Sequence, residues 1–103
     1  MTVAARDGRG KVFVNPSQGL LLVASNLPPA PAGKTYEMWV IPKGGKPLPA
    51  GLFQSANDGT ATHLQRGRIA PNADLVAVTL EDAAGSDSPT TTPLFAAPIR
   101  GLF

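Results

Sequence analysis

An alternating run of side chains between positions 35 and 41 is the feature that most restricts how this chain can fold. Successive residues of a β-strand point to opposite faces, so Tyr36, Met38 and Val40 share one face, which is wholly apolar. The opposite face is mixed and consists of Thr35, Glu37, Trp39 and Ile41. One apolar and one mixed face predict a strand well inside a sheet, with one side in the core and the other partly covered.

Turn residues indicate how this strand is connected. Pro42 and the Gly44-Gly45 pair end it, because proline has no amide hydrogen for the ladder and paired glycines suit a tight hairpin. The returning strand, which ends at Phe53, contains Pro49 and therefore favours the edge of a sheet. No stretch of the chain has a helical period. The sequence predicts an all-β fold, a single antiparallel β-sandwich of seven to eight short strands with Greek-key-like connections.

Length and composition agree with one folded unit. A chain of 103 residues is long enough to bury a core without a metal or a disulfide, and we expect residues 1–103 to form a single domain. The 9 basic residues are scattered and are not interleaved with aromatic side chains, so we expect no nucleic-acid partner. No apolar run approaches the roughly 20 residues of a membrane helix.

The residues that usually carry chemistry are few. One histidine and no cysteine exclude the usual zinc and blue-copper sites, and no nucleophile-elbow motif accompanies His63. Glu37 and Glu81 are the two glutamates that an acid/base pair would use, but they lie on mixed or outward strand faces, where we expect them to solvate the sheet. The sequence therefore predicts neither an enzyme nor a bound cofactor.

Two segments are candidate interaction sites. If their face is open, Trp39, Glu37 and Ile41 form a recognition patch, because a large amphipathic ring carries much contact energy. If it is covered, Trp39 is the central packing residue of the sandwich, and we favour this second interpretation. The second site is a polar loop whose side-chain oxygens lack the dense spacing of a calcium loop. Its candidate residues are Asp82, Ser86, Asp87 and Ser88.

Several short motifs occur in an order that resembles one known family. They are LPPxPxGKxYxxW at 27–39, the Gly-Gly turn, AGLF at 50–53, and VAVTLE at 76–81 followed by Gly85-Ser86 and Ser88-Pro89-Thr90. Together they resemble the C-terminal, extracytoplasmic domain of anti-sigma-K-type anti-sigma factors over nearly the whole chain. The resemblance implies a regulatory β-sandwich without catalytic activity.

The resemblance also implies partners that lie outside these 103 residues. The whole protein is expected to be anchored by an upstream membrane helix and to hold a sigma factor through an absent N-terminal cytoplasmic segment. Proteolysis outside and then inside the membrane, begun by a site-one-type protease, is expected to release that sigma factor. The alternative is a free-standing secreted ligand-binding or adhesion module that uses the Trp39 face or the loop at 82–92.

Overall fold

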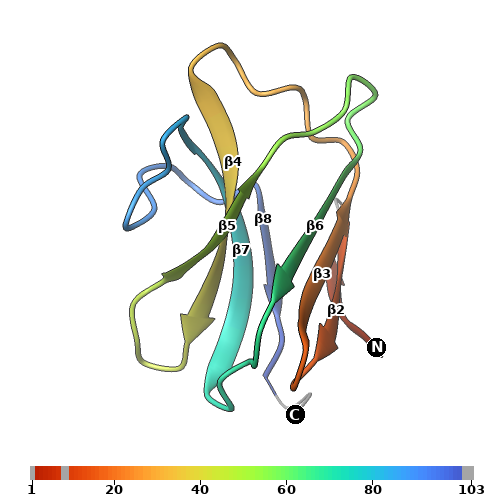
Figure 1. The fold of residues 1–103 in the computed structure, drawn as a ribbon, viewed down its shortest axis with the longest axis vertical. Helices are drawn as coiled ribbons and strands as arrows, with labels where there is room; N and C mark the ends of the chain where they lie inside the picture. Colours follow the sequence, from red (N-terminus) through yellow and green to blue (C-terminus); the bar gives the residue numbers. More distant parts are fainter. Residues whose placement is uncertain (1, 8–9, 101–103) are drawn as a thin grey trace.

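The computed structural model describes residues 2–7 and 10–100 and, for side chains, residues 10–100. Every regular element in this part of the chain is a β-strand (Figure 1). The strands are β1 (Thr2–Asp7), β2 (Gly10–Asn15), β3 (Gly19–Ala24), β4 (Lys34–Pro42), β5 (Leu48–Phe53), β6 (Ala61–Arg66), β7 (Ala73–Asp82) and β8 (Phe95–Pro98). The described residues accordingly contain no helix of the length and apolarity that crossing a membrane requires.

The strands form two antiparallel four-stranded sheets, in the orders β1-β2-β3-β6 and β5-β4-β7-β8. These sheets pack face to face as a sandwich, which confirms the predicted fold class (Figure 1). Strand β4 lies between β5 and β7, as its two faces predict, and the proline-containing β5 is an edge strand. Because β6 lies beside β3 and also contacts β5, strands β3 to β6 follow a Greek-key path.

The inner faces of both sheets supply the main hydrophobic core. Alternate residues along β2, β3, β4 and β7 point inward, and in the middle of each strand these residues are apolar and buried, with Val40 and Leu80 partly buried at the margin. The fully buried members include Val12, Leu20, Leu22, Met38, Val76, Val78 and Phe95. The alternation read from the sequence thus assigns the inward face of β4 correctly, since Tyr36 and Met38 lie in the core.

At a bulge in β5, the backbone around Gly51 lies close to the side chain of His63 on β6. Between the pairs Glu37–Leu52 and Trp39–Pro49 the register shifts, so β5 carries one extra residue, in the segment that contains Gly51. Gly51 has a φ of 112°, and a Cβ atom placed on it would lie 2.3 Å from Nε2 of His63. The His63 ring is held there by a 2.8 Å contact between its Nε2 and the carbonyl oxygen of Ala50.

Gly51→Ala is expected to lower the free energy of unfolding by about 2 kcal/mol, because it adds a steric clash to an unfavourable φ. Urea unfolding of the two proteins measures this difference. Gly67→Ala is the matched control, since Gly67 also has a positive φ, of 124°, but has nothing within 4 Å of the added atom. Equal losses for the two variants would contradict a role for the contact with His63.

Candidate functional site

The two segments that the sequence singles out come together on the outer face of the β5-β4-β7-β8 sheet. Since Tyr36 and Met38 point into the core, Glu37 and Trp39 point away from it. Residues 83–94, here called the clasp loop, connect β7 to β8 outside this face (Figure 1). The backbone N–H of Ser86 donates a 2.9 Å hydrogen bond to Oε1 of Glu37 and so ties the loop to β4.

Trp39 is buried on this outer face, with 0% of its surface exposed. Its indole Nε1–H donates a 2.8 Å hydrogen bond to Oγ1 of Thr79 on the neighbouring strand β7. Trp39 does not belong to the cluster between the two sheets, so it is not the central packing residue of the sandwich. The structure thus places it in a second, smaller buried layer on the outside of the sheet. In this position it forms no open recognition patch.

Glu81 is the residue on which the clasp loop converges. Its carboxylate is 1% exposed and accepts hydrogen bonds from Oγ1 of Thr79 at 2.5 Å and Oγ of Ser86 at 3.1 Å. It also accepts two bonds from Thr90, from the backbone N–H at 3.1 Å and from the hydroxyl. Further along, the hydroxyl of Thr91 donates to the carbonyl oxygen of Leu80 at 2.8 Å. One carboxylate therefore fixes the loop at two points.

The expectation that the two glutamates solvate the sheet is wrong. Glu37 is 3% exposed and Glu81 1%, because the clasp loop covers the face that strand alternation assigned to them. Their charges are tolerated because donors from the loop and from Thr79 meet the carboxylate oxygens. Among the described residues, no buried side-chain nitrogen or oxygen lacks a hydrogen-bond partner.

The two carboxyl groups differ in the direction of their pKa shift. Burial raises the pKa of Glu37 above 4.5, and the hydrogen bond from the Ser86 N–H partly offsets this rise. The nearby negative charges of Glu81 and Asp87 raise the pKa of Glu37 further. Burial also opposes ionisation of Glu81, but hydrogen bonds from Thr79, Thr90 and Ser86 together outweigh it, so the pKa of Glu81 falls below 4.5. The ionised form is therefore costly at Glu37 and favoured at Glu81.

Glu37→Gln is expected to raise the free energy of unfolding at pH 7 by about 1 kcal/mol, since it removes a poorly paired buried charge and keeps an acceptor for Ser86. The raised pKa of Glu37 means that its ionisation reduces stability as pH rises above 4.5. The gain should therefore vanish below pH 4.5. Thermal unfolding at pH 7 and pH 4 measures it, and a less stable variant at pH 7 would contradict this account.

The other candidate loop residues are not gathered into one site. Asp82 accepts a 2.6 Å hydrogen bond from Nζ of Lys34, and both side chains are exposed. Asp87 and Ser88 are exposed, and Ile41 is half-buried near the end of β4. In the part of the chain that the structure describes, no three acidic or histidine side chains are placed to hold a metal ion. What the arrangement does chemically is hold a loop closed.

Sequence reasoning missed the two threonines of the network, Thr79 and Thr90. Thr79 stands two residues before Glu81 on the same strand face, and such a pair with a following loop rich in serine and threonine is a usable signal. All of these residues also lie within the motifs that carry the family resemblance. Those motifs therefore include residues that close the loop as well as residues that build the sandwich.

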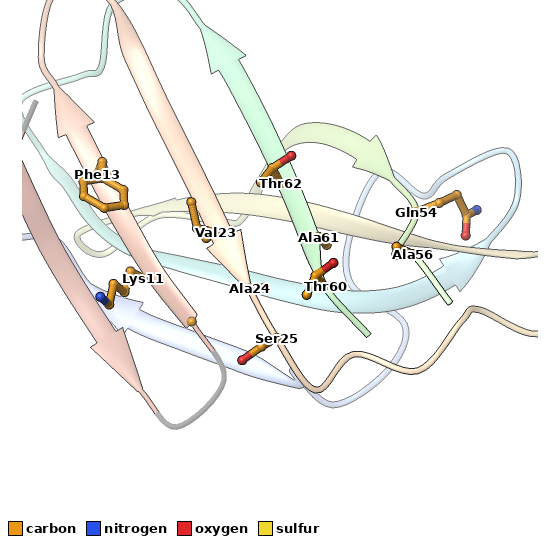
Figure 2. Close-up of a pocket in the computed structure, with 11 residues that line it drawn as sticks. Lys11, Phe13, Val23, Ala24, Ser25, Gln54, Ala56, Thr60, Ala61 and Thr62 are labelled. Atoms are coloured by element: carbon orange, nitrogen blue, oxygen red, sulfur yellow. The ribbon is translucent and has the colours of Figure 1, made fainter. Parts of the chain in front are cut away.

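A second feature is a hollow of about 800 Å³ on the outer face of the other sheet. Figure 2 shows Phe13, Val23 and Thr62 on three neighbouring strands along its floor, with Lys11 at one side. Val23 is 38% exposed, and Lys11 is the one charged residue among the residues that line the hollow. Apolar atoms make up most of the lining of the hollow, and its polar side chains are those of Lys11, Ser25, Gln54, Thr60 and Thr62.

The fold and the site define a small β-sandwich module whose most connected polar network closes a loop over one sheet. The family model for "Anti-sigma-K factor rskA, C-terminal" matches residues 2–94, which include the clasp loop. The chain therefore belongs to this family, which confirms the resemblance. The family is regulatory, is in general membrane-associated and implies a sigma factor as partner. Comparisons with curated proteins and with solved structures found no significant match.

Proposed function

We propose that this chain is the extracytoplasmic regulatory domain of a membrane-bound anti-sigma factor, and that its closed state restrains the proteolysis that frees an extracytoplasmic-function sigma factor. In this proposal residues 1–103 act as one domain on the far side of the membrane. The sigma factor is bound by a cytoplasmic segment outside this chain, and a site-one-type protease makes the first cut. The family match supports the regulatory role.

The observation that carries the proposal is the closure of the clasp loop by Glu81. Proteases need an extended segment that leaves the folded surface, so a long loop is a vulnerable part of a compact sandwich. Here Ser86 and Thr90 tie the loop to a buried carboxylate, and the N–H of Leu94 donates to the carbonyl oxygen of Val78 at 2.8 Å. Opening this network is a discrete event that a signal can promote.

Limited proteolysis with a broad-specificity protease tests whether the clasp protects the loop. Thr90→Val removes the hydroxyl donor to Glu81 and is expected to speed cleavage within residues 83–94 by about tenfold. Thr92→Val is the matched control, because Thr92 is exposed and its side chain makes no hydrogen bond to the described residues. Equal cleavage rates for the two variants, or cutting outside the loop, would contradict the proposed role of the clasp.

A second experiment tests the regulatory consequence in cells. In the membrane-anchored protein, Thr90→Val is expected to raise sigma-dependent transcription in the absence of an inducing signal, whereas Thr92→Val is not. Faster cleavage of the purified domain with unchanged transcription would show that the clasp loop does not control release of the sigma factor. The loop would then have only a structural role.

The hollow of Figure 2 supports a second candidate function, a ligand-binding module. Its apolar floor and single lysine suit a small amphipathic molecule. A screen that finds one chemical class with a saturable rise in melting temperature, lost in Val23→Glu, would establish this function. A screen without such a class leaves the regulatory domain as the better-supported proposal.

A further inference from the structure

One end of the sandwich, here called the basic end, is formed by three connections held together by backbone hydrogen bonds. They are the β2–β3 turn, the β4–β5 hairpin and the β6–β7 loop. Lys43 N–H donates to the Asn72 carbonyl at 2.8 Å, and Gly67 N–H donates to the Gln18 carbonyl at 2.9 Å. The end is thus a single surface assembled from distant parts of the chain.

Exposed cations gather on this surface. Lys43 and Lys46 lie in the hairpin, while Arg66 and Arg68 lie at the end of β6 and in the loop that follows. None of the four forms an ion pair with a described residue. Among the side chains that the structure describes, the one carboxylate near this end is that of Asp74, which accepts a 2.6 Å hydrogen bond from Nε of Arg100. Four positive charges are therefore left without an ion-pair partner in the described part of the chain.

The carboxylates lie toward the opposite end of the sandwich. Asp58 is in the β5–β6 connection, Glu81 and Asp82 are at the end of β7, and Asp87 is in the clasp loop. Lys34, at the start of β4, is paired with Asp82 and confirms that these termini are adjacent. The described cations of the basic end thus outnumber its carboxylates, whereas toward the other end the carboxylates lie beside Lys11 and Lys34.

The first strand begins at the basic end. Thr2 pairs with Val14, next to the β2–β3 turn, so any chain that precedes Thr2 approaches the sandwich from this side. An apolar side chain accompanies the cations, since Leu48 follows the hairpin and is 54% exposed. Positive charge, an exposed apolar side chain and the incoming chain therefore meet on one surface.

We propose that the basic end docks on an anionic phospholipid surface. The cations complement lipid phosphates, and Leu48 reaches the interfacial region. This inference rests on the proposed function, because a membrane anchor before Thr2 would raise the effective concentration of the domain at that surface. Docking this way directs the clasp loop away from the membrane and holds the incoming chain against it.

Co-sedimentation with vesicles tests the docking directly on the purified chain. At low ionic strength, vesicles containing phosphatidylglycerol are expected to bind the protein, vesicles of phosphatidylcholine alone are not, and added salt should weaken the binding. Lys43→Gln/Lys46→Gln and Arg66→Gln/Arg68→Gln are each expected to weaken binding by roughly 25-fold, about fivefold for each cation removed. Lys11→Gln/Lys34→Gln is the matched control, because it removes the same charge from exposed residues toward the other end.

The control variant shows whether vesicle binding depends on the cations of the basic end or only on the net charge of the protein. Equal weakening by all three double variants, or no binding to phosphatidylglycerol vesicles, would overturn the proposal. Tighter binding to a nucleic acid duplex than to the vesicles, lost in the same two variants, would also overturn it and assign the surface to a different partner. Loss of vesicle binding leaves the protease protection of the clasp loop untouched, so failure here is distinct from failure of the proposed function.

Discussion

Replacing Trp39 by alanine is expected to lower the free energy of unfolding by about 3–5 kcal/mol. The side chain is completely buried, although it lies outside the core between the sheets. Its removal leaves a cavity on the outer face of β4 and deprives Thr79 of a hydrogen-bond donor. Urea unfolding followed by circular dichroism measures the loss, since Trp39 is the only tryptophan and the variant has no tryptophan fluorescence.

Trp39→Phe separates packing from hydrogen bonding. The variant keeps most of the buried ring but removes the Nε1–H donor to Thr79, so we expect it to cost about 1–2 kcal/mol. An alanine variant whose unfolding midpoint matches that of the wild type would show that the outer-face layer contributes nothing to stability.

Replacing Glu81 by alanine is expected to lower the free energy of unfolding at pH 7 by about 3 kcal/mol. The variant lacks the carboxylate that accepts four hydrogen bonds. Their donors are the hydroxyls of Thr79, Ser86 and Thr90 and the backbone N–H of Thr90. The cost is large because the hydroxyl of Thr79, which is buried, loses its acceptor away from water, and because the loop loses the contacts that hold it closed. Chemical unfolding at pH 7 gives the value. Asp87→Ala, which alters an exposed carboxylate of the same loop, is the control and should lose little.

The loss at Glu81 should depend on pH with a definite sign. Because the folded-state pKa lies below 4.5, ionised Glu81 stabilises the fold above pH 4.5, and this contribution disappears as pH falls through the folded-state pKa. The difference between wild type and Glu81→Ala should therefore be smaller at pH 3 than at pH 7. Equal differences at both values would mean that the carboxylate acts by its shape and not by its charge.

Local sequence determined that the chain forms strands, and it determined the inward face of β4. The alternation around Met38 assigns the core face of that strand, because side-chain direction in a strand is a property of neighbouring residues. Pro49 correctly marks an edge strand, since a missing amide hydrogen cannot serve a central ladder. The ordered motifs also sufficed to indicate the family, which the match over residues 2–94 confirms.

Only the tertiary structure decided what covers the outer face of β4. Period-two alternation says that Glu37 and Trp39 point the same way, but the covering loop comes from far along the chain. Ser86, which meets Glu37, is 49 residues away in sequence. The basic end also exists only in the folded protein, because hydrogen bonds join turns there that are distant in sequence. Strand periodicity is a local property, whereas the environment of a charge depends on contacts made only after the chain has folded.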